Sequence, residues 1–450
     1  MRERYDVVIV GSGPAGIFAA LEVARRGNKK ILLVERGSGP TERFSRRTTD
    51  GRAWVTGWGG AGAYSDGKLT LTPDVGGVLG DIVGLDRLLA LIEQVDRIYV
   101  EAGAPGDTSG DESPELLALA ERAQRARLRF VPTRVRHMGT DTTQGVLRRL
   151  YDQLAGRVDM LFSTGVKSIR VAGSGFQGVE LEDGRDVAAD FGIVAPGRAG
   201  SAWLKGEAGR LGLTTRAAEV DIGVRIELPA AILADVTRIT HEVKLLYHSR
   251  SFDDRVRTFC VNPYGEVVEE ASEGILTVNG HSYKNRRTPC TNFAILVSSR
   301  FTEPFDDPIT YGRAIARMAN LLAGGVMVQR LGDLRAGRRS TPERIRRSII
   351  QPTLSKATPG DLSFVLPYRH LTGILEMIEA LDEFAPGIDA PHALLYGVEV
   401  KFYSVRFPMN ERLESAIPGL FLIGDGAGIS RGLVQASASG LVAADAILAA

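Results

Sequence analysis

The residues from Tyr5 to Gly37 constrain the fold of this chain more than any other stretch, because they hold strand, turn and helix patterns in one fixed order. The apolar run Val7 to Val10 predicts a buried parallel strand, and the pattern from Pro14 to Arg26 predicts a helix. Strand, tight turn and helix in this order are typical of a turn that binds phosphate groups. The turn between them has the spacing G-x-G-x-x-G, formed by Gly11, Gly13 and Gly16.

Each glycine of this turn has its own expected role. Gly11 allows the tight turn, Gly13 lets a pyrophosphate approach the backbone, and Gly16 lets the helix pack closely on the strand. The helix then offers free N–H groups and the positive end of its dipole to the phosphates. A second apolar strand, Ile31 to Val34, ends in Glu35, whose carboxylate is expected to accept hydrogen bonds from an adenosine ribose. The stretch predicts dinucleotide binding, with NAD and FAD both open; the alternative is a glycine-rich turn with an empty groove.

The length and composition predict a soluble protein with two or three lobes. The chain has 450 residues, a net charge of +1 and 44% hydrophobic residues, which suffice for a large core. Cys260 and Cys290 are its only cysteines, too far apart for a C-x-x-C pair and too few for a disulfide framework or a zinc site. We therefore expect no metal and a reducing, cytoplasmic setting. Glycines interrupt the apolar N-terminal stretch, which argues against a signal peptide, and no stretch is apolar for long enough to span a membrane.

A second stretch rich in small residues follows the nucleotide turn. Its glycines and alanines would let the backbone pass close to a flat ligand, and we expect Gly60 and Ala61 to lie against the cofactor. The alternative is a glycine-rich surface loop. The larger side chains of the stretch are candidates for the ring end of the cofactor or for a substrate: Trp58, Tyr64, Ser65, Asp66 and Lys68.

A second G-x-G-x-x-G, at Gly173, Gly175 and Gly178, is followed by a pattern that is not helical. Residues 179–184 alternate apolar and polar and then turn at Asp183-Gly184, which predicts a small antiparallel meander. Without a helix N-terminus the motif cannot bind phosphate in the usual way, so we expect no separate NAD(P)H site.

The meander is expected to lead into a buried strand, Phe191 to Ala195. Pro196 and Gly197 would then turn the chain back toward the cofactor. Arg198 either faces an anionic group there or forms a surface ion pair.

Helical spacing at residues 84–103, 114–127 and 143–154 predicts a helical insertion without assigned chemistry. Residues 307–324 predict a further amphipathic helix, and a basic segment follows it from Arg330 to Arg347. The basic segment could attract an acidic substrate, a nucleic acid or a partner, but it lacks interleaved aromatics. A solvated helix face balanced by acids elsewhere is the preferred interpretation.

The stretch Val220 to Glu227 alternates as a strand and places Asp221, Gly223, Arg225 and Glu227 on one face. That face is too polar for a core. It points either at a ligand, with Arg225 and Glu227 as charged groups beside a substrate, or at water, where the two would form a cross-strand pair.

Further strands are predicted at residues 257–261, 274–279 and 292–298, with polar residues at or near their ends. His281 is a catalytic candidate there. Asn279-Gly280 is alternatively a plain hairpin turn.

The chain closes with a buried strand that ends in Gly424-Asp425 and feeds a long helix from about Leu433 to Ala449. Asp425 can accept hydrogen bonds from ribityl hydroxyls, and the helix start near Gly432 can face a pyrophosphate or the electron-rich edge of a flavin. An NAD enzyme has no need of such a strand, whereas a flavin enzyme does.

These patterns support a resemblance to a known class. The stretches VGSGPAGIFAA with Glu35 and LFLIGDGAG resemble the FAD-dependent oxidoreductases with a glutathione-reductase-like FAD fold. More narrowly, the stretches GWGGAGAYSDGKL, VDIGVRIE, RTFCVNPYGEVVEEASEG, LTVNGHS and IGDGAGISRG resemble the bacterial FAD-dependent dehydrogenase family over most of the chain.

The resemblance implies noncovalent FAD, with contacts from the first glycine turn, Glu35, the backbone at Val166, and Gly424 to Gly426. It implies little about the substrate. Relatives that hydroxylate aromatics have an Asp-Gly motif where this chain has Pro196-Gly197-Arg198, which argues against an NADPH-dependent hydroxylase.

We therefore expect an α/β fold: a Rossmann-like parallel sheet with a β-meander that binds FAD, a mixed α+β substrate lobe, and a helical insertion. The expected FAD domain comprises residues 1–75, 145–200 and 395–450, the insertion 76–144, and the substrate or cap domain 201–394. The expected cofactor contacts are Gly11, Gly13, Pro14, Ala15, Gly16, Glu35, Arg36, Gly60, Ala61, Val166, Pro196, Gly197, Gly424, Asp425, Gly426, Gly432, Leu433 and Val434.

The expected function is a dehydrogenase or reductase that exchanges a hydride between flavin N5 and a small-molecule substrate, with Lys68, Glu227 or His281 in proton transfer. An external electron donor or acceptor is a possible partner; a membrane or nucleic acid is not expected. One alternative is an oxidase or monooxygenase. The other is a flavin-binding electron relay that docks to a partner or RNA through Arg330 to Arg347.

Overall fold

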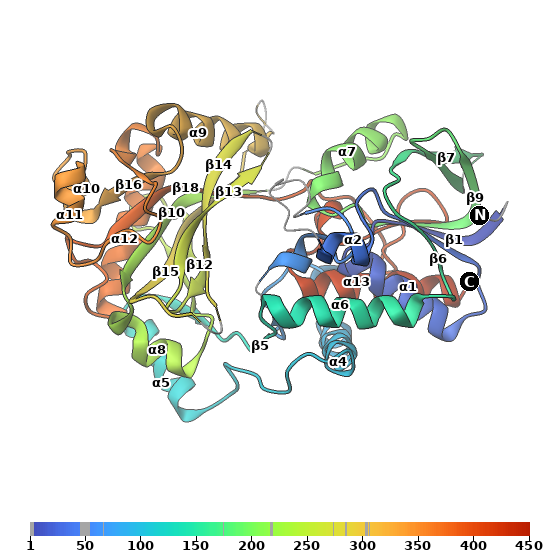
Figure 1. The fold of residues 1–450 in the computed structure, drawn as a ribbon, viewed down its shortest axis with the longest axis horizontal. Coiled ribbons are helices and arrows are strands. Elements are labelled where there is room, and N and C mark those ends of the chain that lie inside the picture. Colours follow the sequence, from blue (N-terminus) through green and yellow to red (C-terminus); the bar gives the residue numbers. More distant parts are fainter. Residues whose placement is uncertain are drawn as a thin grey trace. The chain divides into compact units, whose positions relative to one another are not determined.

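The computed structural model describes residues 4–45, 55–65, 67–173, 175–216, 219–272, 274–283, 286–301, 305 and 307–450. The chain forms two compact units (Figure 1). The first contains residues 1–107, 136–218 and 403–450, and the second contains residues 108–135 and 219–402.

The sheet of the first unit joins a parallel part to an antiparallel meander. Its parallel part pairs Val8 with Leu32 on one side and with Gly192 on the other. The last of its strands in the sequence, β19 (Leu420–Leu422), pairs with β9 (Asp186–Val194) in parallel. On one side of β9 lie, from the edge inward, β6 (Asp159–Leu161), β2 (Ile31–Val34) and β1 (Arg4–Val10). On its other side lie β8 (Gly175–Leu181) and then β7 (Val166–Ala172). The predicted Rossmann-like sheet with a meander is confirmed.

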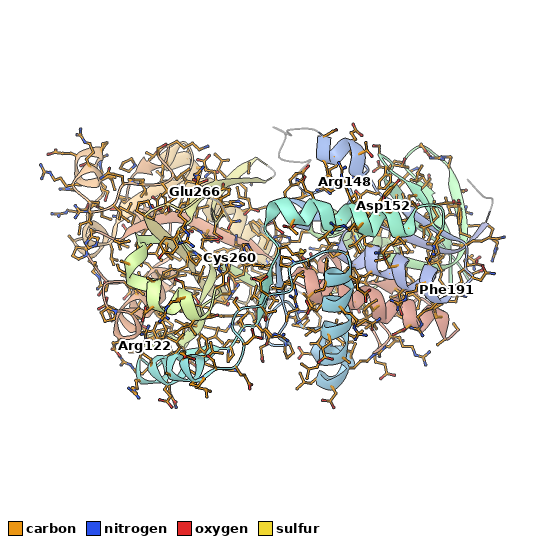
Figure 2. All side chains as sticks on the ribbon, turned by 60° about the horizontal axis from the view of Figure 1, so that its bottom comes forward. Arg122, Arg148, Asp152, Phe191, Cys260 and Glu266 are labelled. Atoms are coloured by element: carbon orange, nitrogen blue, oxygen red, sulfur yellow. The ribbon has the colours of Figure 1, made fainter. Side chains whose placement is uncertain are left out.

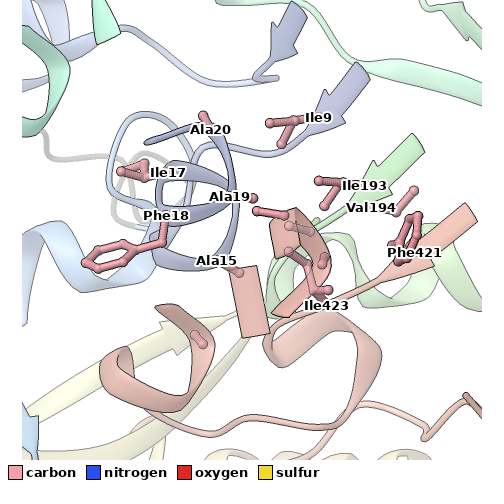
Figure 3. Packing of buried hydrophobic residues seen from close by; sticks show 14 of the residues in the cluster. Ile9, Ala15, Ile17, Phe18, Ala19, Ala20, Ile193, Val194, Phe421 and Ile423 are labelled. Atoms are coloured by element: carbon pink, nitrogen blue, oxygen red, sulfur yellow. The ribbon is translucent and has the colours of Figure 1, made fainter. Parts of the chain in front are cut away.

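Two helices pack together on this sheet, α1 (Pro14–Arg26) and α13 (Leu433–Leu448) (Figure 1). They approach closely because a Cβ on Gly440 would lie less than 3.0 Å from the carbonyl oxygen of Ala15. Figure 3 shows the resulting core, where Ile9, Ile193 and Phe421 of the strands belong to one cluster with residues of α1. Small residues in both helices, such as Ala15, Ala19 and Gly440, permit this contact.

Shorter elements complete the first unit. β3 (Lys68–Thr70) pairs with β5 (Val135–His137) in a separate small sheet. The helical elements are α2 (Pro40–Ser45), η2 (Gly60–Tyr64), α3 (Gly80–Val83), α4 (Leu85–Glu101), α6 (Thr140–Leu154), η3 (Arg198–Gly200), α7 (Ser201–Arg210) and η6 (Asp425–Ala427).

The second G-x-G-x-x-G lies in the hairpin between β7 and β8, as predicted. Gly173 follows the last residue of β7 with a φ of +62°, and Gly175 begins β8, which pairs with β7 antiparallel. A strand and not a helix follows the motif, which confirms that it offers no helix N-terminus to a phosphate.

The sheet of the second unit is mostly antiparallel, with β10 (Val220–Pro229) between β18 (Leu394–Phe402) and β15 (Cys290–Ser299). Its remaining strands are β12 (Arg255–Asn262), β11 (Lys244–His248) and β4 (Arg129–Val131) beyond β15, and β16 (Met327–Arg330) and β17 (Thr358–Pro359) beyond β18. The helical elements are α5 (Pro114–Arg125), η4 (Ala230–Leu233), α8 (Ala234–Ile239), α9 (Pro308–Ala323), α10 (Leu331–Arg335), α11 (Pro342–Arg346), η5 (Leu362–Phe364) and α12 (Tyr368–Phe384).

The two faces of β10 pack against different elements. The apolar residues Ile222, Val224 and Ile226 share one core cluster with residues of α9 and α12. The opposite face meets the hairpin of β13 (Glu266–Ser272) and β14 (Ile275–His281), because Arg225 donates to the side chain of Asn279 on β14. The strand is thus buried on both sides.

This burial corrects two expectations. Arg225 and Glu227 are fully buried, so their face of β10 does not point at water, and the two are not a cross-strand pair. Burial is tolerated because each has a partner on another strand or loop. Asn279-Gly280 is no hairpin turn, because both residues lie inside β14 and pair with β13.

The division into units differs in detail from the expected domains. The stretch 76–144 is divided, with α4 in the first unit and α5 in the second. Among the described residues, no helix is long and apolar enough to cross a membrane.

Candidate cofactor site

The three glycines of the first turn differ in the space around them. A Cβ on Gly11, which has a φ of +99°, would lie less than 3.0 Å from the carbonyl oxygen of Ala195. A Cβ on Gly16 would lie equally close to the carbonyl oxygen of Gly11. A Cβ on Gly13 would meet no atom within 4 Å, so the backbone there is open to a ligand. Gly11 and Gly16 therefore have packing roles, and Gly13 borders free space.

The helix that follows this turn begins without a side-chain cap. The N-cap of α1 is Gly13, Pro14 begins the helix, and its first turn holds no acidic residue. The first N–H groups of a helix need partners from outside it, and an anionic group provides them. α13 likewise begins at Gly432 without a side-chain cap or an acid in its first turn.

The short helix η2 borders both helix starts. A Cβ on Gly60 would lie 3.1 Å from the Cα of Gly13, and one on Gly62 would lie 2.5 Å from the side chain of Leu433. Both glycines therefore permit a close approach to the other chain segments. Gly60 and Ala61 begin this short helix, and their contact with a cofactor stays a prediction.

The carboxylate of Glu35 lies at the end of β2 and is almost completely buried. Its Oε2 accepts hydrogen bonds from the backbone N–H and the hydroxyl of Ser12, both at 2.8 Å. Its Oε1 accepts from the N–H groups of Gly37 at 2.7 Å and Gly57 at 2.9 Å. A carboxylate has about four acceptor positions, so these four donors fill it. Glu35 joins three segments of the site, and its contact with a ribose stays a prediction.

The turn at residues 424–426 lies beside the first glycine turn. A Cβ on Gly424 would lie 3.0 Å from the Cβ of Ala15, and one on Gly426 would lie 2.8 Å from the side chain of Pro196 and from the carbonyl oxygen of Gly197. The N-terminal, middle and C-terminal stretches singled out in the sequence therefore meet in this unit.

Asp425 is anchored within this turn. Its Oδ1 accepts a hydrogen bond from the hydroxyl of Ser430 at 2.6 Å, and Arg198 Nε lies 3.9 Å from its Oδ2. Burial raises the pKa of Asp425 above its ordinary range, while Arg198 and Ser430 oppose the shift. Arg198 thus forms an ion pair, and Asp425 has acceptor capacity left for a hydroxyl.

The remaining expected cofactor contacts differ in burial and in the element to which they belong. Arg36 is exposed, Val166 begins β7 and is buried, and Leu433 and Val434 form the first turn of α13. Trp58 is a core residue, because its indole is fully buried and donates to the carbonyl oxygen of Leu147 at 2.8 Å.

The remaining candidates of residues 58–68 have local partners or lie elsewhere. The hydroxyl of Tyr64 donates to the carbonyl oxygen of Arg43, and that of Ser65 donates to the carbonyl oxygen of Gly62. Lys68 begins β3 in the first unit and is half-buried, and Asp66 lies outside the described residues.

Arg43 shapes this loop and was not singled out in the sequence. Its guanidinium donates to the carbonyl oxygens of Trp58 at 2.6 Å and Gly60 at 2.8 Å, and it stacks on the ring of Tyr64. Burial lowers the pKa of Arg43, although Tyr64 and Glu35 oppose the shift. Its sequence surroundings, a short polar stretch with other arginines, carry no signal of burial.

The second unit contains a layer of buried charges on one face of its sheet. Arg225 is fully buried and donates to both carboxylate oxygens of Glu399, at 2.8 and 2.9 Å. It also donates to Asn292 Oδ1 at 2.8 Å and to the carbonyl oxygen of Cys260 at 3.1 Å. Lys401 lies 3.1 Å from Glu399. Buried charges at this density are costly, so they mark a functional-site candidate.

The second ion pair of this face joins Arg257 of β12 to Asp221 of β10. Arg257 Nη2 lies 2.5 Å from Asp221 Oδ2, and Asp221 is fully buried. Asp221 and Arg225, which the sequence placed on one face of β10, therefore both form buried ion pairs.

Glu227 lies further along the same face. Its carboxylate accepts hydrogen bonds from the hydroxyls of Tyr396, at 2.5 Å, and Thr353. Burial raises the pKa of Glu227, while the hydrogen bonds from Thr353 and Tyr396 oppose the shift. Burial and the charge of Glu227 also raise the pKa of the Cys290 thiol to about 12, which makes that thiol inert at neutral pH.

His281 ends β14, where it is half-buried and its ring stacks on that of Tyr283. Glu227 and His281 thus belong to the second unit and Lys68 to the first. Their expected part in proton transfer stays a prediction.

Comparisons with known families agree with these features. Residues 6–221 match a family described as an FAD binding domain, and residues 219–402 match one described as FAD-dependent protein, C-terminal domain-like. A curated relative, an uncharacterized protein from Clostridium beijerinckii, is 28% identical over 479 residues, with 98% of this chain and 80% of the relative covered.

Solved structures also align with the chain. Glycine oxidase from Geobacillus kaustophilus is 13% identical with a TM-score of 0.40, covering 99% of this chain and 95% of its own. L-proline dehydrogenase from P. horikoshii is 12% identical with a TM-score of 0.43, covering 99% and 94%. A quinol-fumarate reductase is 15% identical with a TM-score of 0.45, covering 100% and 72%.

The residues of the first unit fit the cofactor that the matched families name. The open space at Gly13, the two uncapped helix starts and the turn at Asp425 provide what a flavin dinucleotide needs. FAD carries hydride and electron transfer, so a protein that depends on it performs redox chemistry. With residues 6–221 matched to an FAD binding domain and residues 219–402 to an FAD-dependent C-terminal domain, this chain is an FAD-dependent oxidoreductase.

Proposed function

We propose that this oxidoreductase is a dehydrogenase or reductase that exchanges a hydride between flavin N5 and a small-molecule substrate. When bound, FAD supplies the hydride chemistry. The observation that supports the proposal most is the open backbone at Gly13, above a helix start that has no cap of its own. We also propose that the FAD fold is of the glutathione-reductase-like kind, as the resemblance of the first and last stretches suggests.

In this proposal the first unit is the FAD-binding domain. The N–H groups at the start of α1 bind the pyrophosphate, with Gly13 giving access and Pro14 and Ala15 beside it. The remaining contacts come from the chain segments that meet there: Gly11, Gly16, Glu35, Arg36, Gly60, Ala61, Val166, Pro196, Gly197, Gly424, Asp425, Gly426, Gly432, Leu433 and Val434. Asp425 accepts hydrogen bonds from ribityl hydroxyls, and the positive end of the α13 dipole favours negative charge at the flavin.

The second unit is then the substrate domain, and its buried charged face orients the substrate. For proton transfer we propose Lys68, Glu227 or His281. Two observations support Glu227: burial raises its pKa, and its carboxylate accepts a hydrogen bond from the Tyr396 hydroxyl.

Among possible partners we propose a small-molecule substrate and an external electron donor or acceptor, in the cytoplasm. The basic segment from Arg330 to Arg347 supports no nucleic-acid role, because Arg335, Arg338 and Arg347 form ion pairs with acids of the same unit. A relay that docks through this segment is therefore the weaker candidate.

The experiment is anaerobic reduction of the purified holoenzyme, followed by exposure to air while the flavin absorbance is recorded. A dehydrogenase or reductase is expected to reoxidise over many minutes. Reoxidation within seconds would instead establish an oxidase or monooxygenase. Purified protein with no flavin absorbance, and no uptake of added FAD, would refute the cofactor assignment itself.

A further inference from the structure

The edge of the charged face holds an aromatic ring that contacts two cations. Phe259 of β12 is half-buried, and the guanidinium carbon of Arg257 lies 4.7 Å from its ring centroid. The ammonium nitrogen of Lys401, on β18, lies 5.6 Å from the same centroid. Cys260, the next residue of β12, is labelled in Figure 2 and locates this strand in the second unit. The arrangement offers an apolar surface with positive charge on it.

Three cations near this ring, Arg225, Arg257 and Lys401, have two buried acids, Glu399 and Asp221, as ion-pair partners. Glu399 receives both Arg225 and Lys401, so one carboxylate serves two cations. Arg257 has the carboxylate of Asp221. The remaining acid near Lys401 is Glu270, whose side chain is 43% exposed and whose Oε2 lies 3.7 Å from the ammonium. These three cations and two buried acids therefore have an excess of about one positive charge. Glu227, further along the face, accepts hydrogen bonds from the hydroxyls of Thr353 and Tyr396.

Lys401 also has more donors than acceptors. Its ammonium group has three N–H bonds, and its ion pairs among the described residues are with Glu399 and Glu270. At least one N–H is thus left for another acceptor, although only 11% of the side chain is exposed. Burial lowers the pKa of Lys401, but Glu399 and Glu270 raise it, and the net direction is upward, so the group stays charged at neutral pH. A charged donor without an acceptor in so little water is costly.

We propose that Lys401 binds the carboxylate of a small-molecule substrate, with Arg257 adding positive charge and Phe259 contacting an apolar part of the same molecule. The inference rests on the proposed function, because it names the substrate class of that reaction. A monoanion balances an excess of about one charge, which favours a carboxylate over a doubly charged phosphate ester. The ring of Phe259 favours an aromatic or aliphatic group beside the carboxylate.

The test is isothermal titration of the purified holoenzyme with three probes of similar shape: benzoate, benzamide and phenyl phosphate. The variants are Lys401→Met, which removes the charge, and Lys401→Arg, which keeps it. Lys356→Met is the matched control, because Lys356 belongs to the same unit and its ion pair with Glu269 is at the surface, with the lysine side chain 66% exposed. Flavin absorbance and thermal unfolding are recorded for each protein.

Benzoate is expected to bind about tenfold or more tightly than benzamide and phenyl phosphate, since a charged hydrogen bond is lost or mismatched with either. Lys401→Met should weaken benzoate binding by about tenfold to a hundredfold, Lys401→Arg by a few fold at most, and Lys356→Met not at all. Equal binding of benzoate and benzamide, undiminished binding to Lys401→Met, or no benzoate binding to the wild type would each overturn the inference. Tighter binding of phenyl phosphate would replace the carboxylate with a phosphate.

Two further outcomes are separable. If Lys401→Met does not fold, the comparison of probes on the wild type and on Lys401→Arg decides. Protein that binds benzoate as expected but contains and takes up no flavin would keep this site and refute the proposed redox function.

Discussion

At the scale of single residues, the glycines of the first turn have different roles: Gly16 allows close packing, and Gly13 leaves space for a ligand. Gly13 has a φ of −73°, which any residue can adopt, and a Cβ there would meet no protein atom within 4 Å. We predict that Gly13→Ala leaves the unfolding midpoint of the flavin-free protein within about 2 °C of the wild type. The methyl group should nevertheless weaken FAD binding by about tenfold, or about 1.4 kcal/mol, measured by fluorescence titration with FAD.

Gly16→Ala is the matched control for that substitution. Its Cβ would lie less than 3.0 Å from the carbonyl oxygen of Gly11, so the helix must move away from the strand. The flavin-free variant should lose about 1–3 kcal/mol of stability. If Gly13→Ala destabilised the flavin-free protein as much as Gly16→Ala, the open space at Gly13 would not be a ligand space.

The raised pKa of Glu227 predicts how the stability of the protein depends on pH. Burial raises its pKa in the folded protein above that of the unfolded chain, so the folded state binds the proton more tightly. The corresponding stability is present below the unfolded pKa of about 4.3 and is lost as the pH rises through the folded pKa. Glu227→Gln has no such loss. Its stability relative to the wild type should therefore increase as the pH rises from about 4 and then level off.

This difference is measurable by urea unfolding at a series of pH values, with labelling of the buried Cys290 thiol as the signal for the second unit. Tyr396→Phe is a useful companion, because it removes a donor that holds the Glu227 carboxylate and should steepen the pH dependence. A relative stability of Glu227→Gln that decreases with rising pH would show that the carboxylate is stabilised in its charged form.

At the scale of elements, the close packing of α1 and α13 depends on Gly440. A Cβ at this position would lie less than 3.0 Å from the carbonyl oxygen of Ala15. We predict that Gly440→Ala destabilises the protein by about 1–3 kcal/mol and lowers the flavin content, since it displaces two helix starts at once. Denaturation and the ratio of flavin to protein absorbance measure both effects.

Gly145→Ala provides the control, because Gly145 also lies inside a helix, α6, but a Cβ there would meet no atom within 4 Å. Alanine favours a helix over glycine by about 1 kcal/mol, so this variant should be slightly more stable than the wild type. Equal effects of the two substitutions would mean that helix propensity, and not packing, decides at Gly440.

The elements also show which parts of the fold the sequence could predict. The bounds of α1 and β2 agree with the prediction, because their apolar periodicity, the glycines and Pro14 are local signals. The meander was predictable for the same reason, since the alternation and the Asp183-Gly184 turn lie within one short stretch.

The charged face was only half predictable. Alternation placed Asp221, Arg225 and Glu227 on one side of β10, but burial of that side follows from Glu399, which is 174 residues from Arg225 in the chain. Without that partner a charged face is expected to point at water. Trp58 was misassigned in a similar way, because Leu147, whose carbonyl oxygen accepts its indole N–H, lies far along the chain.

At the scale of the whole molecule, the two units carry separate natural probes. All three tryptophans, Trp54, Trp58 and Trp203, lie in the first unit by sequence, and both cysteines, Cys260 and Cys290, lie in the second. Tryptophan fluorescence therefore reports unfolding of the first unit, and thiol labelling reports unfolding of the second. No residue has to be introduced by mutation to follow each unit.

We predict that FAD stabilises the first unit more than the second. At an FAD concentration of about 100 times its dissociation constant, the gain is about 2.7 kcal/mol for the unit that binds it. The midpoint from tryptophan fluorescence should rise by a few degrees, and the midpoint from thiol labelling should rise less. Identical shifts of both midpoints would show that the two units unfold as one.

The division of the first unit into three segments has a consequence for how the protein is made. α1 ends at Arg26, whereas α13, which packs on it, begins at Leu433. A ribosome adding roughly 5–20 residues per second needs about 20–80 s to synthesise the intervening chain. During that time the apolar side of α1 lacks its neighbour, and the whole of the second unit, which ends at residue 402, is synthesised. The second unit is therefore complete before the first, and a nascent chain has no complete dinucleotide site until α13 leaves the ribosome.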